Sequence, residues 1–307
     1  MKINFVAKKM SEDFKNTPQL IQTGLKDVDL NRFSWRKGEL VVISGRPSMG
    51  KSSFMLTQVV NMSIMSGIPV GVFSLETDEI TLTKKLISNH CKIDSHAISN
   101  WNLQDSEWKA LDSCIDEIKN AEIYLDCPAR LSIQELYVRS KRMVIEHGVR
   151  AIFIDYIQLM SVTNSYSDNR YNEMNYISRE LKNMARELDI TVFAISQMNR
   201  NSENNNLRIG TEGKKPRLSD LRDSGTLCDD ADVVLFIYRP EYYRITEDEM
   251  GNSLIGVAEI MVKKNRNGET FTAQTGYKPE FHLFSDQFIQ NKPIIINSKE
   301  TDESVPF

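Results

Sequence analysis

The sequence predicts an α/β protein in which a mostly parallel, twisted sheet is flanked by helices. Short apolar runs alternate with stretches of helical periodicity through the centre of the chain. The first such unit has a strand near 39–44, a helix near 51–66 that ends at Gly67, and a second strand near 69–75. Parallel strands need a crossover connection, which is usually a helix, so this order is typical of a βαβ unit covered on both faces.

The same alternation continues along the chain. Ser132 and Glu135 have the spacing of a capping box, which predicts a helix that begins there and ends at Gly148. Extra helices are expected between about 78 and 126. The later strands and the third long helix are expected at 149–154 (strand), 172–188 (helix), 190–196 (strand), 231–238 (strand) and 256–263 (strand).

A dipeptide near the C-terminal end of the predicted domain indicates a β-hairpin. Asn267-Gly268 follows the two late strands, and this pair favours a tight turn between antiparallel strands. We therefore expect one domain over residues 21–296, with about seven strands, four or more helices and a C-terminal β-hairpin. Residues 1–20 are predicted to be a linker or docking arm, and the charged, aperiodic residues 297–307 a disordered tail.

Composition restricts the class of protein. The 307 residues are 40% hydrophobic and 26% charged, which is ordinary for a globular protein. No apolar run approaches the roughly 20 residues that cross a bilayer, and the N-terminus lacks a signal-peptide pattern, so we expect no membrane association and a cytoplasmic location. The net charge of −4 argues against a coating of nucleic acid but leaves room for a local basic channel, because residues 200–222 hold six Lys or Arg against three acids.

The four cysteines do not form a recognisable framework. Cys91, Cys114, Cys127 and Cys228 are scattered, with no C-x-x-C pair and no clustered histidines. This spacing indicates neither a zinc site nor a disulfide framework. We therefore predict reduced, buried thiols.

A phosphate-binding loop is the strongest motif. The sequence GRPSMGKS at 45–52 fits G-x-x-x-x-G-K-[ST], directly after a predicted strand and before a predicted helix. Backbone amides of such a loop cradle phosphates, the lysine reaches the β and γ phosphates and the serine can bind Mg²⁺, whereas a chance glycine-rich turn would lack this context. The expected nucleotide-binding residues are Gly45, Arg46, Pro47, Ser48, Met49, Gly50, Lys51, Ser52 and Ser53.

Three polar residues at strand ends complete a candidate hydrolytic site. Asp155 ends a buried strand and can hold Mg²⁺ together with Ser52, although an acid there can also cap a helix. Glu76 is our candidate to polarise the attacking water, with a helix-start acid as the alternative. Gln197 can sense the γ-phosphate or be a plain strand-ending residue. All three fall at the edge where open α/β sheets bind ligands.

Together these segments resemble, in order and spacing, the motifs of the DnaB replicative helicases. The resemblance spans about 23 to 268, and its later motifs are more specific than the phosphate loop. The segments that carry it are GRPSMGKS at 45–52, SLE at 74–76, FIDYIQLM at 153–160, AISQMNR at 194–200, LSDLRDSG at 218–225 and KNRNG at 264–268.

The resemblance implies a RecA-like P-loop NTPase core and a hexameric ring with ATP at subunit interfaces. It also implies 5′ to 3′ movement on single-stranded DNA threaded through the pore. Carried onto this sequence, Lys51, Ser52 and Asp155 bind Mg²⁺ and ATP. Glu76 activates water, and Gln197 couples the nucleotide to the following loop.

Two further sites are implied by the resemblance alone. Arg266 matches an arginine finger that reaches the γ-phosphate in the adjacent subunit, with Lys264 assisting; without the resemblance, a solvated hairpin end is the simpler interpretation. The loop contact to DNA matches Arg222, Asp223, Ser224 and Gly225. Because aromatic residues are scarce there, we expect the loop to track the DNA backbone with little base stacking, or else to be a flexible solvated loop.

The sequence departs from the family pattern in places. Thr77 stands where the family usually has Met, the stretch after Gly268 follows the family loosely, and nothing corresponds to the N-terminal helical domain that contacts primase. We expect an excised motor domain or a short natural form, with primase and a helicase loader as partners. The alternatives are a RecA-like recombinase or other DNA-binding ATPase without unwinding, and a nucleotide-dependent assembly module.

Overall fold

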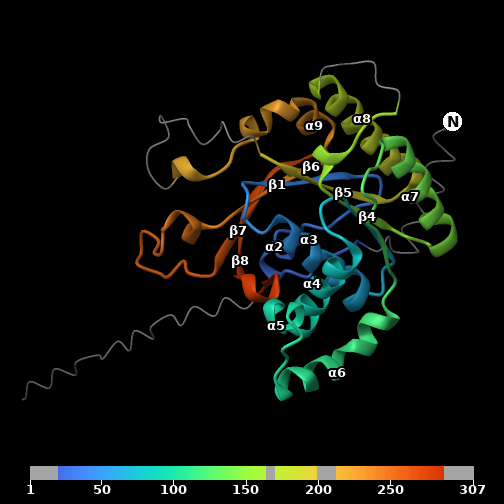
Figure 1. The fold of residues 1–307 in the computed structure, drawn as a ribbon. Helices are drawn as coiled ribbons and strands as arrows, with labels where there is room; N and C mark the ends of the chain where they lie inside the picture. Colours follow the sequence, from blue (N-terminus) through green and yellow to red (C-terminus); the bar gives the residue numbers. More distant parts are fainter. Residues whose placement is uncertain (1–19, 164–169, 199–211, 287–307) are drawn as a thin grey trace, which may run out of the picture.

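The computed structural model describes residues 20–163, 170–198 and 212–286, and a nine-stranded sheet runs through them (Figure 1). The strand order is β3-β2-β4-β5-β1-β6-β7-β8-β9, parallel from β3 to β6 and antiparallel from β6 to β9. The predicted mostly parallel sheet is confirmed. The strands are β1 (Leu40–Gly45), β2 (Val70–Ser74), β3 (Ile123–Asp126), β4 (Ala151–Asp155), β5 (Thr191–Gln197), β6 (Val233–Tyr238), β7 (Val257–Asn265), β8 (Phe271–Lys278) and β9 (Leu283–Ser285).

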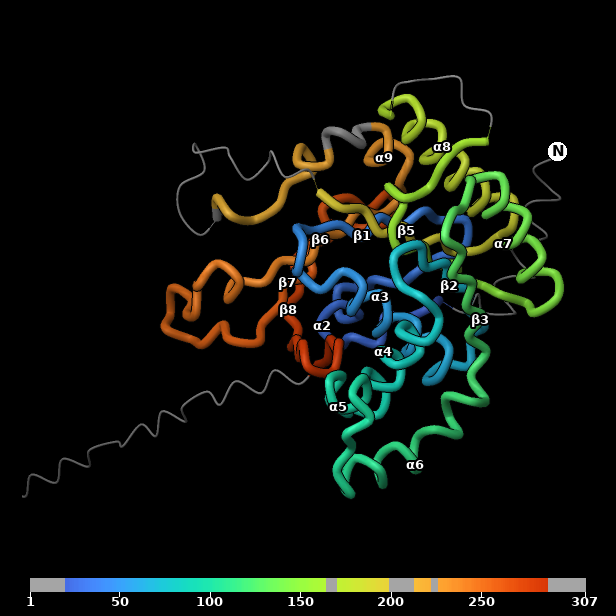
Figure 2. Tube along the Cα trace, in the orientation of Figure 1, coloured from blue at the N-terminus to red at the C-terminus, as the bar shows by residue number. Residues whose placement is uncertain are grey.

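Helices cover both faces of this sheet. Figures 1 and 2 show α7, α8 and α9 along one face, with α2, α3 and α4 on the other, while α5 and α6 project beyond the sheet at the foot of the view. A π-helical turn (Asn61–Met65) extends α3 toward Gly67, which has a φ of +63°. The α-helices are α2 (Lys26–Asp29), α3 (Lys51–Val60), α4 (Glu79–Cys91), α5 (Ser95–Ser99), α6 (Asp105–Asn120), α7 (Ile133–His147), α8 (Arg170–Leu188) and α9 (Gly225–Asp230).

Two apolar layers explain why the central strands read as continuous hydrophobic runs. Along β1, Val41 and Ile43 belong to one buried cluster with Phe54 of α3, whereas Leu40 and Val42 belong to the other, on the side of α8. Successive side chains of a strand point to opposite faces, so a strand covered on both faces must be apolar at every position. The predicted βαβ unit is confirmed.

Local signals set the ends of α7 as expected. Ser132 Oγ accepts a hydrogen bond from the backbone N–H of Glu135 at 3.2 Å, and the Glu135 carboxylate accepts one from the N–H of Ser132 at 2.9 Å. Gly148 follows the last turn with a φ of +66°, a conformation that glycine adopts without steric cost. The capping box and the glycine stop are both confirmed.

The C-terminal hairpin contains an irregularity that the sequence does not reveal. β7 and β8 pair through a turn at Asn267-Gly268, as predicted. Between β6 and β7, however, Val234 lies opposite Lys264 and Leu235 lies opposite Val262, so the strand carries an extra residue at this point. Such a bulge reverses the alternation of side chains beyond it. Val262 packs in the α3-side cluster, yet Lys264 contacts α9 on the other face.

The prediction of reduced, buried thiols was wrong for Cys91 and Cys114. Cys91, at the end of α4, and Cys114, within α6, form a disulfide with their Cα atoms 5.9 Å apart. Cys127 and Cys228 are free thiols, as predicted, but they are half-buried rather than buried. The packing of α6 on α4 brings the pair together across 23 residues of sequence, which spacing alone does not indicate.

Some predictions concern residues outside the described ones. The arm at 1–20 and the tail at 297–307 are in this position, apart from residue 20, so both stay predictions. The expected count of about seven strands was low, because β3 and β9 are short and carry weak patterns. Within the residues that the structure describes, none of the helices has the length and apolarity needed to cross a membrane.

Candidate nucleotide-binding site

The phosphate loop opens onto a cavity of about 360 Å³ at the carboxyl ends of β1, β2, β4 and β5. Strand order explains the convergence, because β2 and β4 are neighbours and β5 lies between β4 and β1. Their C-terminal residues therefore reach one edge. The cavity is lined by every residue that the sequence predicts for catalysis or metal binding at this edge, namely Lys51, Ser52, Glu76, Asp155 and Gln197.

The loop's backbone requires glycine at the second glycine of the motif, Gly50. Gly50 precedes α3 with a φ of +92°, and a Cβ there would lie 3.2 Å from ring carbons of Tyr277 and Phe284. Lys51 Nζ donates a hydrogen bond to the carbonyl oxygen of Arg46 at 2.9 Å, which holds the ammonium over the loop. These features fit a phosphate cradle with a lysine placed to meet phosphate oxygens.

Burial sets the electrostatics of the site. Asp155 is buried, and desolvation raises its pKa, while a hydrogen bond from Ser52 and the charge of Lys51 oppose that rise. Burial also lowers the pKa of Lys51 to about 8, against the attraction of Asp155 and Glu76. A hydroxyl and a carboxylate held together in this way are the oxygen ligands that Mg²⁺ prefers in phosphoryl-transfer sites.

Some of the other residues of the predicted loop line the cavity, and the rest contact other parts of the protein. Pro47, Ser48 and Ser53 line the cavity. Arg46 instead donates to the Tyr243 hydroxyl at 2.7 Å with its guanidinium 5.4 Å from that ring, and Met49 is buried in the core. Among the described residues, Gly45, Arg46 and Met49 do not line the cavity.

Gln197 is held at its backbone. Gln158 donates to the Gln197 carbonyl at 3.2 Å and accepts from the Gln197 N–H at 3.3 Å. Gln158 also donates to Ser196 Oγ at 2.9 Å. These bonds fix the end of β5 where Gln197 enters the cavity, just before residues 199–211, which lie outside the described part of the chain.

Sequence reasoning missed several residues of the cavity. Lys85 of α4, Tyr156, Tyr277 of β8 and His282 all line it. The Tyr277 hydroxyl lies 3.3 Å from Ser53 Oγ, and His282 Nδ1 lies 3.4 Å from the same oxygen. Tyr156 falls within the FIDYIQLM motif at 153–160, whereas no motif marks the other three positions. Strand pairing of β7, β8 and β9 carries Tyr277 and His282 back to the phosphate loop.

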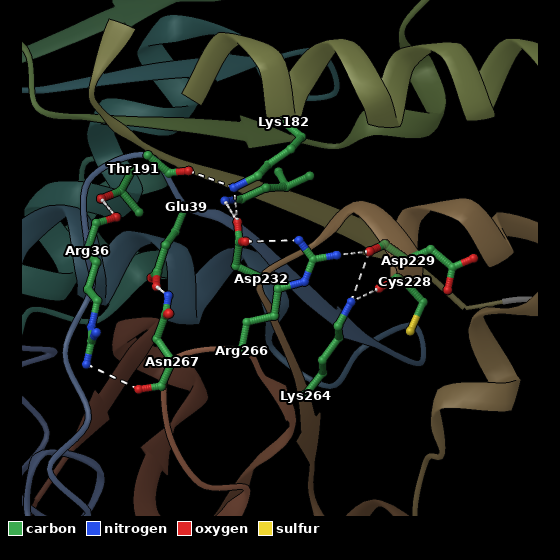
Figure 3. Close-up of polar contacts among 12 residues, drawn as sticks. Arg36, Glu39, Lys182, Thr191, Cys228, Asp229, Asp232, Lys264, Arg266 and Asn267 are labelled. Atoms are coloured by element: carbon green, nitrogen blue, oxygen red, sulfur yellow. Dashed lines mark hydrogen bonds and ion pairs between the residues drawn. The ribbon is translucent and has the colours of Figure 1, made fainter. Parts of the chain in front are cut away.

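Arg266 and Lys264 lie at the opposite edge of the sheet, where β1 and β6 begin (Figure 3). Arg266 Nη1 is 3.4 Å from a carboxylate oxygen of Asp232, whose other oxygen accepts from the N–H of Leu40 at 2.8 Å. From Leu40 to Gly45, β1 spans roughly 17 Å at about 3.3 Å per residue. The structure therefore does not bring Arg266 and Lys264 to this chain's own phosphate loop.

The predicted DNA contact is placed only by its backbone. Arg222, Asp223 and Ser224 belong to the 3-10 helix Leu218–Ser224, and Gly225 begins α9. Their side chains lie outside the described part of the structure. The helix that follows is anchored on α8, because Ser178 Oγ donates to the Asp230 carboxylate at 2.7 Å.

Fold and site together define a P-loop nucleotide-binding protein with a RecA-like sheet. Residues 21–286 match the family described as "DnaB-like helicase C terminal domain", and the chain belongs to that family.

Curated relatives and solved structures agree with this family. The Replicative DNA helicase DnaB of Rickettsia prowazekii (strain Madrid E) is 35% identical over 288 residues, covering 87% of this chain and 58% of the relative. The Replicative DNA helicase DnaC of Bacillus subtilis (strain 168) is 32% identical over 264 residues, covering 86% and 56%. The chain thus spans somewhat more than half the length of these relatives.

Two solved structures share the fold. The first, described as an ATPase domain, superposes with a TM-score of 0.81 at 32% identity, covering 93% of this chain and 98% of that one. The structure titled "The Structure Of A DnaB-Like Replicative Helicase And Its Interactions With Primase" gives a TM-score of 0.78 at 32% identity, covering 93% and 67%. The predicted RecA-like core and C-terminal hairpin are therefore confirmed.

Proposed function

We propose that this chain is the ATP-hydrolysing motor of a replicative DNA helicase, which moves 5′ to 3′ on single-stranded DNA. One observation carries the proposal. The nucleotide-binding half of the machinery lies at the carboxyl edge of the sheet, and the hairpin cations Lys264 and Arg266 lie at the amino edge. A complete hydrolytic site then needs two chains, with the carboxyl edge of one facing the amino edge of the next.

Within one chain, the cavity residues divide the chemistry. Lys51 and the loop amides bind the β and γ phosphates, and Ser52 and Asp155 hold Mg²⁺. The metal, when bound, neutralises charge that develops on the phosphate oxygens. Glu76 is exposed at the rim of the cavity and orients and polarises the attacking water, and Gln197 links the nucleotide to the loop after β5.

The adjacent chain supplies the remaining positive charge. Arg266 acts as an arginine finger toward the neighbour's γ-phosphate, with Lys264 beside it. Such a finger raises the rate by about 10³ to 10⁵ because it stabilises charge in the transition state. Repetition of this contact between identical chains is heterologous and closes into a ring, which we propose to be a hexamer.

The DNA contact follows from the ring. Residues 222–225 lie where the 3-10 helix Leu218–Ser224 meets α9, and we propose that they hold the phosphate backbone of the strand in the pore. Primase and a helicase loader are proposed as partners of the assembled protein. The family assignment disfavours the alternatives of a recombinase or a passive assembly module.

Mixing two inactive variants tests the two-chain site. Chains with Lys51→Ala keep the finger but cannot hold the nucleotide, and chains with Arg266→Ala hold the nucleotide but lack the finger. ATP hydrolysis is measured for each variant alone and for mixtures at several ratios, with and without single-stranded DNA. We expect the mixtures to hydrolyse ATP faster than either variant alone, with a rate per chain that rises with protein concentration.

The matched control places both substitutions in one chain. Adding the double variant to the parent must not create a complete site at the interfaces it occupies, so it should only dilute activity. If mixtures of the single variants stay as inactive as their components, while the parent hydrolyses ATP independently of concentration, Arg266 does not act between chains and the ring motor is rejected.

A further inference from the structure

The hairpin cations rest on a polar cluster at the amino edge of the sheet (Figure 3). Asp232, just before β6, is its centre, with a side chain only 8% exposed. Its Oδ2 accepts from the N–H of Leu40 at 2.8 Å and from Lys182 Nζ at 2.6 Å. Its Oδ1 faces Arg266 Nη1 at 3.4 Å. Oδ2 therefore bonds to the core, and Oδ1 contacts the guanidinium of Arg266.

The C-terminal end of α9 holds the same two cations. The carbonyl oxygen of Asp229 accepts a hydrogen bond from Arg266 Nη2. Lys264 Nζ donates to the carbonyl oxygens of Cys228 and Asp229 at 2.6 and 3.0 Å. The last carbonyls of a helix have no partner within the helix and carry partial negative charge, so they attract cations.

We propose that Asp232, together with the carbonyl end of α9, positions Arg266 for the nucleotide bound by an adjacent chain. The inference rests on the proposed function, because it requires Arg266 to act between chains. Asp232 is a positioning residue in this scheme and touches no substrate.

Two observations indicate that Arg266 can contact a phosphate while it keeps its contacts to Asp232 and Asp229. A guanidinium has five N–H donors, and two nitrogens make the contacts to Asp232 and Asp229. The Arg266 side chain stays 46% exposed, so an incoming phosphate can reach the remaining donors. An arginine that is ordered beforehand loses less conformational entropy when it meets the transition state.

The turn beyond the finger is anchored on its other side. Asn267 Nδ2 donates to Glu39 Oε1 at 2.6 Å, and the Asn267 carbonyl accepts from Arg36 Nη2 at 3.3 Å. Arg266 itself joins the sheet edge through its N–H, which donates to the Asp232 carbonyl at 2.9 Å. The backbone of the turn is therefore held by contacts that do not involve Asp232 Oδ1, so loss of the Oδ1 contact alone would act on the guanidinium.

Asp232→Asn separates the two roles of the carboxylate. An asparagine has one acceptor oxygen, and the two donors from Leu40 and Lys182 draw it toward the core. The amide NH₂ then faces the Arg266 guanidinium. Because both groups are hydrogen-bond donors, they cannot bond to each other. The contacts to the core are kept while the contact to the finger is lost.

The mixing assay tests this in the assembled protein. Asp232→Asn is placed either in the Lys51→Ala chain, which supplies the finger, or in the Arg266→Ala chain, which supplies the nucleotide. We expect the restored rate to fall by about 10- to 100-fold in the first case, as for a misplaced catalytic group, and far less in the second. In the otherwise unmodified chain, Asp232→Asn should lower kcat for ATP hydrolysis and leave KM nearly unchanged, because the phosphate loop lies at the other edge.

Two variants separate positioning from a general loss of structure. Asp189→Asn makes the same change at the same edge, where Asp189 pairs with Lys37 at 3.4 Å, and should preserve the restored rate. Lys182→Gln removes the lysine partner of Asp232 but keeps the acceptor for Arg266, so it should lower the Tm and leave kcat nearly unchanged.

The outcomes are distinguishable. Equal losses from Asp232→Asn in either chain, or the same kcat loss from Lys182→Gln, would show that Asp232 is only structural and overturn the inference. A mixture of Lys51→Ala and Arg266→Ala that restores nothing would instead reject the two-chain site itself, and the positioning role with it.

Discussion

The carboxyl and amino edges of the sheet hold their charged groups in different ways. At the carboxyl edge, Lys51, Asp155 and Glu76 converge on one cavity, because they lie at or after the ends of the parallel strands β1, β4 and β2. At the amino edge, Arg266 and Lys264 are tied to helix carbonyls and a buried carboxylate. Groups proposed to act on the chain's own ligand line a cavity, whereas groups proposed to act on a neighbour's ligand lie outside that cavity, on helix carbonyls and a buried carboxylate.

Glu76, at the carboxyl edge, is a residue whose substitution we expect to reduce activity strongly. Glu76→Gln should lower kcat for ATP hydrolysis by about 10² to 10⁴, the usual contribution of a group that handles the proton of the attacking water. Nucleotide affinity should remain, because Lys51 and the loop are unchanged. Steady-state hydrolysis and equilibrium binding of a labelled nucleotide measure the two quantities.

Glu79→Gln is the matched control for that change. Glu79 is exposed in the first turn of α4 and does not line the cavity among the described residues. It should retain full activity. A Glu76→Gln protein that hydrolyses ATP at the parental rate would remove Glu76 from the mechanism.

Gly50 of the phosphate loop should tolerate a side chain less well than Gly148, which follows α7. Gly50→Ala adds a Cβ 3.2 Å from Tyr277 and Phe284 in a left-handed conformation, whereas Gly148→Ala has the same kind of conformation with nothing within 4 Å of the new Cβ. We expect Gly148→Ala to cost about 1 kcal/mol of the free energy of unfolding, and Gly50→Ala about 1–2 kcal/mol more because the two rings must move. Urea unfolding measures both.

The affinity for nucleotide should also differ between Gly50→Ala and Gly148→Ala. Gly50→Ala should weaken it, and Gly148→Ala, at the end of α7, should not. Equal affinities in the two variants would show that the loop tolerates a side chain at Gly50, despite the close approach of Tyr277 and Phe284.

The two edges should also differ, by a smaller amount, in how their contributions to stability depend on pH. Burial lowers the pKa of His282, at the carboxyl edge, from 6.5, so its neutral form is favoured in the fold and stability is lost as pH falls below 6.5. Burial raises the pKa of Glu39, at the amino edge, from 4.5, so stability is present below 4.5 and is lost as pH rises through the higher folded pKa.

Two variants test these opposite signs by thermal unfolding across pH. His282→Gln should reduce the loss of stability below pH 6.5, and Glu39→Gln should raise stability near neutral pH relative to the parent. Glu39 Oε2 has no hydrogen-bond partner among the described residues, so the buried charge is poorly compensated there. A Glu39→Gln protein that is less stable than the parent at pH 7 would contradict this sign.

Much of the carboxyl edge could be predicted because its signals are local. The phosphate loop, the capping box at Ser132 and the alternating apolar runs each depend on the conformation of a few consecutive residues. Asp155 and Glu76 could be placed because parallel strands bring their carboxyl ends to one edge. The roles of these residues, and of Gln197, stay predictions.

The α/β class, the phosphate loop and the strand-ending acids follow from the sequence alone. Other features of the site depend on contacts between distant segments. The bulge before Lys264 turns the hairpin cations toward α9, strand pairing carries Tyr277 and His282 to the phosphate loop, and helix packing joins Cys91 to Cys114. The physical reason is the range of the interactions, because register, bulges and side-chain contacts between distant segments are set by packing that local patterns do not encode.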